Sequence, residues 1–348
     1  MKLLTIAVPS YNVEKTLAAT LDSLCIADAV EKLDVLVVND GSTDGTAGIA
    51  RGYLERFPQC VRLINKENGG HGSAVNAGIA AAQGRYFRVV DGDDRLAQRG
   101  LLKLLGCLEE TDCDLVAANY EKVPADGGAA QPVRFAGVEY GRVYGFDELP
   151  ADGSIYFGIH SSVFKTSIFT EHALRLQEHT YYVDTEFCLL PVPFIKTVLF
   201  LEETVYLYSV GGAGQSINFD NFVSHYDDHY RVVRRMAAYC AAAECAVPQR
   251  EYMFAAASKL CFTQYMLAAF YDSDRARGRR RAAEFDAWLA GASPPLYGRL
   301  GRSLSIRAMR LLHFRALPGA RLKSAVKHIY TRLRPLSRGK HRFTYYNR

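Results

Sequence analysis

The sequence lacks the features that define disulfide-rich, zinc-binding and membrane-spanning proteins. Its eight cysteines are scattered, with no CxxC pair and no regular spacing. This pattern favours reduced thiols over a disulfide framework or a structural zinc site. No apolar run approaches the roughly 18 residues of a transmembrane helix, and the opening residues MKLLTIAVPSYN become polar too early for a signal peptide. We therefore expect a cytoplasmic protein, soluble or bound at a membrane surface.

Several nucleotide-binding and nucleic-acid-binding signatures are also absent. There is no GxxxxGK[ST] motif, which excludes a P-loop ATPase, and no GxGxxG opens the first strand–helix turn, which argues against a dinucleotide-dependent dehydrogenase. Because no nucleic-acid recognition module is visible, we expect no nucleic-acid partner.

Acidic residues are missing from the last part of the chain. Residues 299–348 hold 14 Lys or Arg and no Asp or Glu, so residues 1–298 carry a formal charge of −9 within a total of +5. Within 305–317 the apolar side chains lie broadly on one side of a helix, with arginines around them. Such a helix can adsorb to an anionic membrane surface. Packing on the acidic body and an oligomer contact are the alternatives.

Strand-like apolar runs alternate with helical patterns in the first third of the chain. The runs are LLTIAVPSY (3–11), DVLVVND (34–40), VRLINK (61–66), RYFRVVD (85–91) and DLVAANYEKV (114–123). This order predicts a doubly wound, mostly parallel α/β sheet with helices on both faces. The run LFLEETVYLYSV (199–210) predicts one more strand, and the later pattern is helical. We expect a boundary at 218, giving domains 1–218 and 219–348. The helices expected in the second are 222–245, 249–271, 282–290, 303–316 and 320–333.

Three aspartates follow the strand that ends in RVVD. Asp91, Asp93 and Asp94 surround a single glycine, and carboxylates at i and i+2 beyond a strand can reach one hard divalent cation. The cation would bridge diphosphate oxygens of a nucleotide. The alternative is a solvated turn in which Asp94 caps the next helix. An apolar strand that leads straight into three aspartates favours the metal-diphosphate site.

Two further segments belong to the same edge of the sheet, because the carboxyl ends of parallel strands meet there. Asp40 can accept hydrogen bonds from a base or a ribose, although DGST is also a good turn and capping sequence, and we assign Asp44 to the helix cap. The glycine-rich loop ENGGHGSAVNAG (67–78) can bring backbone N–H groups to a phosphate, or can be an ordinary turn. Its His71 could contact phosphate or acceptor, whereas His160 is expected to be an ordinary polar residue.

Four motifs in this order resemble the nucleotide-sugar-binding half of a family 2 glycosyltransferase with the GT-A fold. They are VPSYN (8–12), VVNDGSTDGT (37–46), NGGHGSAVNAG (68–78) and VVDGDDRL (89–96). The resemblance is close over residues 1–120 and looser to 218. It implies that Asp40 contacts the uracil or ribose, and that Asp91 and Asp93 form the Asp-x-Asp motif, with Asp93 a ligand of Mn²⁺ or Mg²⁺. The residues it places around the nucleotide are Pro9, Tyr11, Asn12, Asp40, Lys66, Asn76 and Asp91.

The resemblance also implies a catalytic base near the acceptor. The matching segment is YYVDTEF (181–187), with Val183 where the family commonly has Glu. Asp184 is then the candidate base and Glu186 a supporting or alternative group, since direct displacement at an anomeric carbon needs the acceptor hydroxyl deprotonated as it attacks. The alternative is that Asp184 only caps a helix that starts at Thr185.

We therefore expect an inverting, metal-dependent glycosyltransferase. It would move a hexosyl or N-acetylhexosaminyl group from a nucleotide diphospho-sugar, UDP-linked, to a hydroxyl of a glycan or lipid-linked saccharide in cell-surface polysaccharide synthesis. The Gln-x-x-Arg-Trp motif of processive relatives is absent, which favours one or few additions. The location would be cytoplasmic, with peripheral attachment at the inner face of the plasma membrane through 299–348 left open. A sugar nucleotidyltransferase and a non-catalytic sugar-nucleotide-binding or membrane scaffold protein are the alternatives.

Overall fold

The computed structural model describes residues 2–150, 154–211 and 219–315. The chain forms two compact units, the first made of Met1–Ser216 with Ala243–Met253, the second of Ile217–Ala242 with Phe254–Arg348. The predicted boundary at 218 lies close to the first break, but the return of the short segment 243–253 to the first unit was not expected. Within the described residues, no helix combines the length and the apolar character needed to cross a bilayer.

A ten-stranded mixed sheet forms the first unit. Its order is β3-β2-β1-β4-β9-β6-β10-β5, with β7 paired to β6 and β8 to β10. The strands are β1 Lys2–Ser10, β2 Leu33–Asp40, β3 Val61–Lys66, β4 Gly84–Val89, β5 Arg95–Leu96, β6 Leu115–Pro124, β7 Gln131–Val133, β8 Val143–Gly145, β9 Ser162–Lys165 and β10 Thr197–Val210. The long pairings (β1 with β2 and β4, β2 with β3, β6 with β10) are parallel, whereas β9 is antiparallel to both β4 and β6. The predicted α/β class is confirmed.

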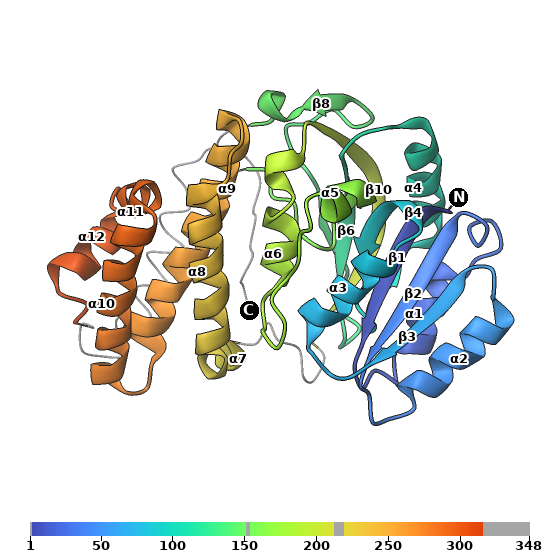
Figure 1. Cartoon of the computed structure of the whole chain (residues 1–348), viewed down its shortest axis with the longest axis horizontal. Coiled ribbons are helices and arrows are strands. Elements are labelled where there is room, and N and C mark those ends of the chain that lie inside the picture. The colour runs from blue at the N-terminus through green and yellow to red at the C-terminus, as the bar shows by residue number, and fades with distance from the viewer. Residues whose placement is uncertain (1, 151–153, 212–218, 316–348) are drawn as a thin grey trace. The chain divides into compact units, whose positions relative to one another are not determined.

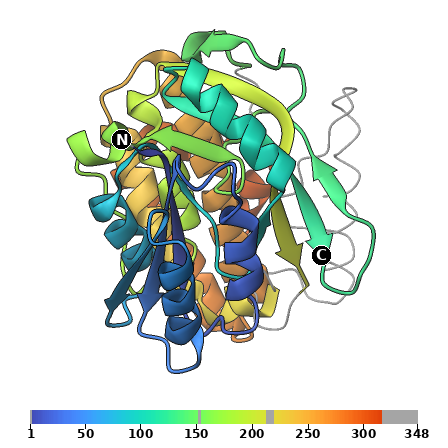
Figure 2. The ribbon, with the colours of Figure 1, turned by 90° about the vertical axis from the view of Figure 1, so that its right-hand side faces the viewer.

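Helices cover both faces of this sheet. They are α1 Leu17–Leu24, α2 Thr46–Arg56, α3 His71–Ala81, α4 Gln98–Glu110, α5 Thr166–Glu171 and α6 Asp184–Leu189, with 3₁₀ turns η1 Phe146–Glu148 and η2 Val192–Phe194. Val35 and Val37 of β2 face the core beneath α1, α2 and α4, whereas Leu36 and Val38 pack against Ala74 of α3. Side chains alternate between the two faces of a strand, so a strand buried on both faces is apolar throughout. Figure 1 shows α2 and α3 on opposite sides of β1–β3, and in Figure 2 α1 and α4 lie in front of the strands.

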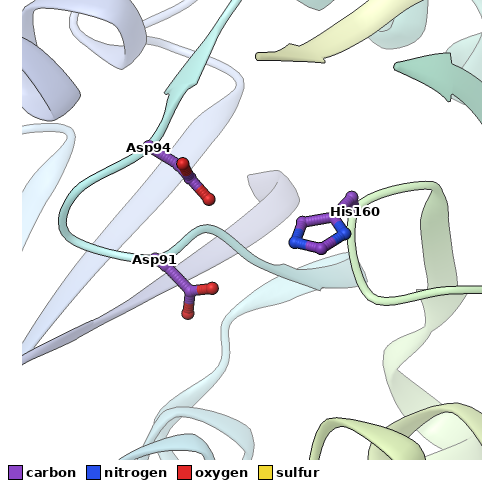
Figure 3. Close-up of side chains that lie close together, drawn as sticks. All are labelled: Asp91, Asp94 and His160. Atoms are coloured by element: carbon purple, nitrogen blue, oxygen red, sulfur yellow. The ribbon is translucent and has the colours of Figure 1, made fainter. Parts of the chain in front are cut away.

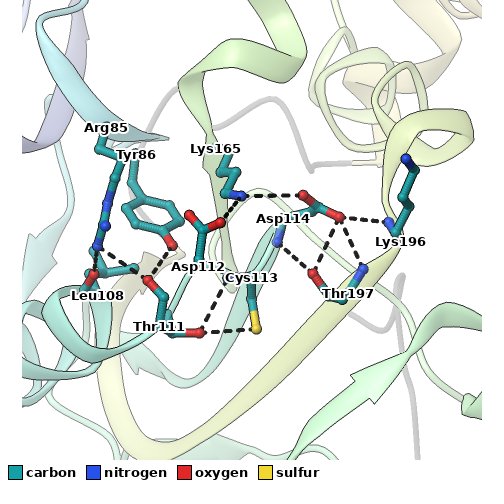
Figure 4. Close-up of polar contacts among 10 residues, drawn as sticks. All are labelled: Arg85, Tyr86, Leu108, Thr111, Asp112, Cys113, Asp114, Lys165, Lys196 and Thr197. Carbon is teal, nitrogen blue, oxygen red and sulfur yellow. Dashed lines mark hydrogen bonds and ion pairs between the residues drawn. The ribbon is translucent and has the colours of Figure 1, made fainter.

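A polar network fixes the amino end of β6 between its two neighbours (Figure 4). The Asp114 carboxylate accepts hydrogen bonds from the backbone N–H groups of Lys196 (2.8 Å) and Thr197 (3.0 Å) at the start of β10. Lys165, at the end of β9, lies 3.0 Å from the carboxylate of Asp112 and 3.7 Å from that of Asp114. These contacts set the antiparallel β9 in place, and the loop that enters β9 carries His160.

The second unit is helical. Its elements are α7 Phe219–Ser224, α8 Tyr226–Ala242, the end of α9 (Val247–Met266), the π-helical turn η3 Leu267–Tyr271, α10 Arg275–Ala292, α11 Pro294–Leu300 and α12 Leu304–Leu311. Asp272 is buried after the π-turn, 2.6 Å from Arg277 and 3.1 Å from Arg281. On α12, Arg310 lies 2.7 Å from Asp286 of α10. The predicted helix over 320–333 lies outside the described residues.

Candidate active site

Asp40 ends β2 and organises the glycine loop that follows β3. Its carboxylate accepts hydrogen bonds from the backbone N–H groups of Gly69 (3.0 Å) and Gly70 (2.8 Å) and from Nζ of Lys66 (2.6 Å). Gly70 has a φ of +82°, a left-handed conformation that glycine adopts without strain. Asp40 and Lys66 therefore bond to each other, and Asp40 also bonds to the loop. A contact of either residue with a nucleotide stays a prediction.

The VPSYN segment turns sharply where β1 ends. Pro9 lies within β1, paired with Val38. Asn12 has a φ of +52°, donates its backbone N–H to Oγ of Ser42 (3.1 Å) and accepts from the backbone N–H of Thr43 (2.9 Å). These bonds join the turn to the DGST turn beyond β2. They leave the ring of Tyr11 52% exposed at the carboxyl edge of the sheet, where a base can stack.

Hydrogen bonds define the positions of Asp44 and Asn76. The carboxylate of Asp44 accepts from the backbone N–H of Thr46, the first residue of α2, at 3.0 Å, as the capping assignment expected. Asn76, by contrast, is buried in α3 and bonds both the N–H (2.8 Å) and the C=O (2.9 Å) of Leu176. Its amide therefore fastens the segment that leads to α6, and a contact of Asn76 with the nucleotide stays a prediction.

Asp91 follows β4 and contacts the glycine loop. Its Oδ1 lies 3.0 Å from Nε2 of His71, the first residue of α3. Burial opposes the charge on both groups, but the contact outweighs it: the pKa of Asp91 is lowered, and the pKa of His71 is raised by Asp91, Asp184 and Asp40 together. The pair is thus a carboxylate–imidazole contact at the amino end of a helix, where the backbone dipole also favours negative charge on a ligand.

Asp94 does not cap a helix, because α4 begins at Gln98. It is buried, and its carboxylate accepts from the hydroxyl of Tyr206 (2.7 Å) and the backbone N–H of Ser209 (2.7 Å), both on β10. Burial, together with the charges of Asp91 and Asp93, raises the pKa of Asp94 to about 8. The alternative in which Asp94 caps the next helix is wrong, because β10, more than a hundred residues along the chain, supplies its partners.

Asp91, Asp94 and His160 can each place one ligand atom within 4.8 Å of the others (Figure 3). Two carboxylates and an imidazole form a donor set suited to a divalent transition ion. Asp93 is exposed and lies outside this group. Partial desolvation of its carboxylate by the surrounding protein, together with the charge of Asp91, raises its pKa to about 6. The structure therefore brings together a different trio from the Asp91–Asp93 pair implied by the family resemblance.

His160 sits in an aromatic and cationic setting. Its ring stacks on Tyr208 with a centroid distance of 4.1 Å and meets the edge of Tyr206 at 4.9 Å. Behind it, the fully buried Arg88 donates Nη2 to the carbonyl of His160 (3.1 Å). Burial lowers the pKa of His160 to about 4, so the ring is neutral, as a metal ligand must be. Neither periodicity nor motif singled out His160, since only the fold places it here.

Asp184 is the first residue of α6. Burial raises its pKa, while His71 and the backbone N–H of Thr185 oppose that rise. Since α6 begins at Asp184 itself and Val183 precedes it as the N-cap, the alternative that Asp184 caps a helix from Thr185 does not fit. Glu186 is fully buried and accepts from the N–H (2.8 Å) and side-chain amide (2.5 Å) of Gln177. Glu186 thus anchors the segment that precedes α6. Asp184 is the carboxylate of this helix that interacts with His71 and Asp91.

The segment before α6 is tied to the glycine loop. The backbone N–H of His179 donates to the carbonyl of Gly69 at 2.5 Å, and a Cβ on Gly72 would lie 2.0 Å from the carbonyl oxygen of Gln177. His179 and Tyr182 both have a positive φ, at 49° and 68°. Such strain concentrates at functional sites. The close approach of the two loops places Asp184 among the charges that act on His71.

Known proteins match this chain in sequence and in fold. The model of glycosyl transferase family 2 matches residues 5–171. The uncharacterized glycosyltransferase EpsJ of Bacillus subtilis is 36% identical over 124 residues, which cover 36% of this chain and 36% of EpsJ. The glycosyltransferase GlyG of Streptococcus pneumoniae is 32% identical over 120 residues, covering 34% of this chain and 39% of GlyG. The chain thus spans less than half the length of either relative.

Among solved structures, TarS 1–349 of S. aureus has a TM-score of 0.71 at 19% identity, covering 99% of this chain and 94% of that one, and shows the same fold. TarS 1–349 has also been solved in complex with UDP and with UDP-GlcNAc. The mannosyltransferase PcManGT of Pyrobaculum calidifontis, solved with GDP-Man and Mn²⁺, matches at a TM-score of 0.51 and 17% identity, covering 94% of this chain and 87% of that one. The family match thus identifies residues 5–171, just under half of this chain, as a glycosyl transferase family 2 domain.

Proposed function

We propose that the first unit transfers a sugar from a nucleotide diphospho-sugar, UDP-linked, to an acceptor hydroxyl. The observation that carries this proposal is the His71–Asp91 contact of 3.0 Å, because it joins the glycine loop to the carboxylates after β4 and lies within reach of the charge of Asp184. Donor phosphates, leaving group and acceptor can then share one edge of the sheet. The complexes of TarS with UDP and UDP-GlcNAc support the choice of donor, and a hexosyl or N-acetylhexosaminyl group is the sugar class.

A divalent cation, Mn²⁺ or Mg²⁺, fits the donor set of Asp91, Asp94 and His160, whose ligand atoms already lie within 4.8 Å of one another. Burial and the charges of Asp91 and Asp93 raise the pKa of Asp94 to about 8, and a cation would oppose this rise. When bound, the cation neutralises charge on the diphosphate leaving group. Asp93, exposed beside this trio, remains a second candidate ligand because it completes the Asp-x-Asp motif.

The side chains of this chain would divide the remaining work. The exposed ring of Tyr11 stacks on the base, with Pro9 and Asn12 shaping the turn beneath it. The loop held by Asp40 and Lys66 presents backbone N–H groups to the diphosphate. Asp184 accepts the proton of the acceptor hydroxyl as that oxygen attacks the anomeric carbon, and a single displacement inverts the configuration. Burial raises the pKa of Asp184, although His71 opposes the rise. A raised pKa makes Asp184 a stronger base than a solvated aspartate.

The acceptor we propose is a glycan or lipid-linked saccharide of cell-surface polysaccharide synthesis. The chain is 31% identical to the minor teichoic acid biosynthesis protein GgaB of Bacillus subtilis over 116 residues, which supports this class. Residues 299–348, with 14 basic and no acidic residues, would hold the enzyme at the inner face of the plasma membrane. One or few sugars would be added to each acceptor.

A UDP-release assay tests the proposal. The full chain is incubated with a panel of UDP-sugars, with Mn²⁺, Mg²⁺ or EDTA, and in parallel with sugar 1-phosphates plus UTP. We expect slow UDP release from at least one donor with metal only, since donor hydrolysis proceeds without the acceptor. Pyrophosphate release from UTP would instead identify a nucleotidyltransferase. Absence of both activities and of donor binding would contradict an enzymatic function.

A further inference from the structure

Helix α12 (Leu304–Leu311) carries apolar side chains on two sides. Ile306 and Met309 are buried in the second unit, whereas Leu304 and Leu311 are 73% and 81% exposed, and Leu312 after the helix is 40% exposed. Residues four and seven apart share a helix face, so Leu304, Ala308 and Leu311 form one stripe pointing away from Ile306 and Met309. We call Leu304, Ala308, Leu311 and Leu312 the outer face of α12.

The inner side of α12 is firmly attached, which fixes the direction of the outer face. Arg310 lies 2.7 Å from Asp286 of α10, and its guanidinium lies 3.7 Å above the ring of Tyr297 of α11. The backbone carbonyl of His313, just past α12, accepts from Nε of Arg279 at 3.0 Å. Figure 1 shows α12 beside α10 and α11. The leucines of the outer face therefore cannot turn inward without breaking this half-buried ion pair.

Cationic side chains rim the outer face. Arg307 is exposed on α12, Arg315 is exposed after it, and Arg279 and Arg280 are exposed on α10 next to the end of α12. The sequence after Arg315 adds nine Lys or Arg and no Asp or Glu. Among the described residues, the outer face thus combines exposed leucines with neighbouring arginines.

The leucines and arginines of the outer face of α12 indicate which partner can bind there. A second copy docked face to face would set one arginine rim against another, and like charges at an interface are unfavourable. The remaining segment of the chain, 316–348, has the same sign of charge and would be repelled in the same way. An anionic lipid leaflet supplies both a negative surface for the arginines and an apolar layer for the leucines.

We propose that the outer face of α12 inserts into an anionic phospholipid leaflet, with Arg307, Arg315 and Arg279 at the headgroups. The inference deepens the proposed membrane location, on which it rests, and is independent of the donor chemistry. It assigns the apolar anchoring to four residues of the folded second unit, whereas the proposed location required only the net charge of 299–348.

Vesicle co-sedimentation of the full chain tests the proposal. Vesicles of phosphatidylcholine with phosphatidylglycerol are compared with pure phosphatidylcholine at low and high salt. We expect wild type to bind the anionic vesicles and salt to weaken this binding. The partition coefficient of the double variant Leu304→Ser/Leu311→Ser should be lower by about tenfold or more. Arg307→Gln should reduce binding to a smaller extent. The matched control is Val247→Ser, because Val247 is an equally protruding apolar side chain (70% exposed) on the first unit.

Thermal unfolding and UDP release, measured without vesicles, show whether each variant is folded and active; both should match wild type, so a failure of the donor chemistry would appear separately. The proposal is overturned if the double serine variant sediments with anionic vesicles as wild type does, since charge alone would then account for binding. It is equally overturned if wild type binds neither vesicle, or if wild type is a dimer that the serine variant converts to a monomer.

Discussion

Nε2 of His71 lies 3.0 Å from Oδ1 of Asp91, which joins the glycine loop to the carboxylates that follow β4. The contact occupies one oxygen of Asp91 and orients the other. Second-layer partners of this kind set the geometry of metal ligands and tune their affinity. His71 also lies near Asp184 and Asp40, whose charges help to raise its pKa. His71 thus interacts with three acidic groups of the proposed donor and acceptor sites, and these groups favour its protonated form.

His71→Ala is expected to weaken Mn²⁺ binding roughly 10–100-fold, the usual cost of losing a second-layer partner. Titration calorimetry or the electron paramagnetic resonance signal of free Mn²⁺ measures this without turnover. His225→Ala is the matched control, since His225 makes a similar contact with Asp228 (3.1 Å) in the second unit. Unchanged Mn²⁺ affinity in His71→Ala would show that the contact does not support a metal ligand.

Asp94→Asn is expected to stabilise the metal-free protein, and more so at pH 8 than at pH 5. The pKa of Asp94 is raised to about 8 in the folded chain, against about 3.9 when unfolded. Between these values the folded state holds a proton that the unfolded state has lost, so stability falls as pH rises, and the substitution removes that loss. Differential scanning fluorimetry across this pH range measures it.

The same melting curves decide between the two candidate ligand pairs. Mn²⁺ should raise the Tm of wild type and of Asp93→Asn but not that of Asp94→Asn, because Asp94 belongs to the clustered trio and Asp93 is exposed. The opposite outcome would assign the cation to the Asp-x-Asp pair of the family motif.

Asp184→Asn is expected to lower kcat for sugar transfer by about 10²–10⁴-fold, the range for a general base, with little change in donor KM. In wild type, kcat/KM should rise with pH through the pKa of Asp184. Because burial raises that pKa above 3.8, the rise should occur at higher pH than for a solvated aspartate.

Asp126→Asn, at an exposed position on the loop after β6, is the control for loss of a carboxylate. If the Asp184→Asn enzyme is fully active, another residue must act as the general base, and Glu186 is the next carboxylate to test.

Asn76→Ala is expected to destabilise the protein by about 1–3 kcal/mol, because it leaves the buried N–H and C=O of Leu176 without the amide that bonds them. Urea unfolding measures this change. If Asn76 instead contacts the nucleotide, the substitution should weaken UDP binding in protein that unfolds at the wild-type urea concentration.

The sheet could be predicted where buried strands appear in the sequence as runs of apolar residues. The strands β1 to β4 and β6 lie at the predicted runs. The signal is strongest for β1 and β2, because strands covered on both faces are mostly apolar. The long run 199–210 likewise lies within β10. The two-residue β5 and the four-residue β9 were missed, since so few residues carry no periodic signal, and β9 changes the pairing by entering antiparallel between β4 and β6.

The site was predictable only in its local parts. Asp91 was found because it directly follows an apolar strand, and Asp44 because it precedes a helix. Asp94 and His160 depend on partners that the fold brings from β10 and from the loop before β9. The position of Asn76 in a motif predicts a place beside the nucleotide, and its bond to Leu176, a hundred residues away, could not be read from the sequence.

The most direct measurement of the central claim is the affinity for UDP, by titration calorimetry, in Mn²⁺ and in EDTA, for wild type and Asp91→Asn. A diphosphate held through a cation on Asp91 predicts tight binding by wild type with Mn²⁺, weak binding in EDTA, and weak binding by Asp91→Asn under both conditions. Equal UDP affinity in all four experiments, or no binding in any of them, would contradict it.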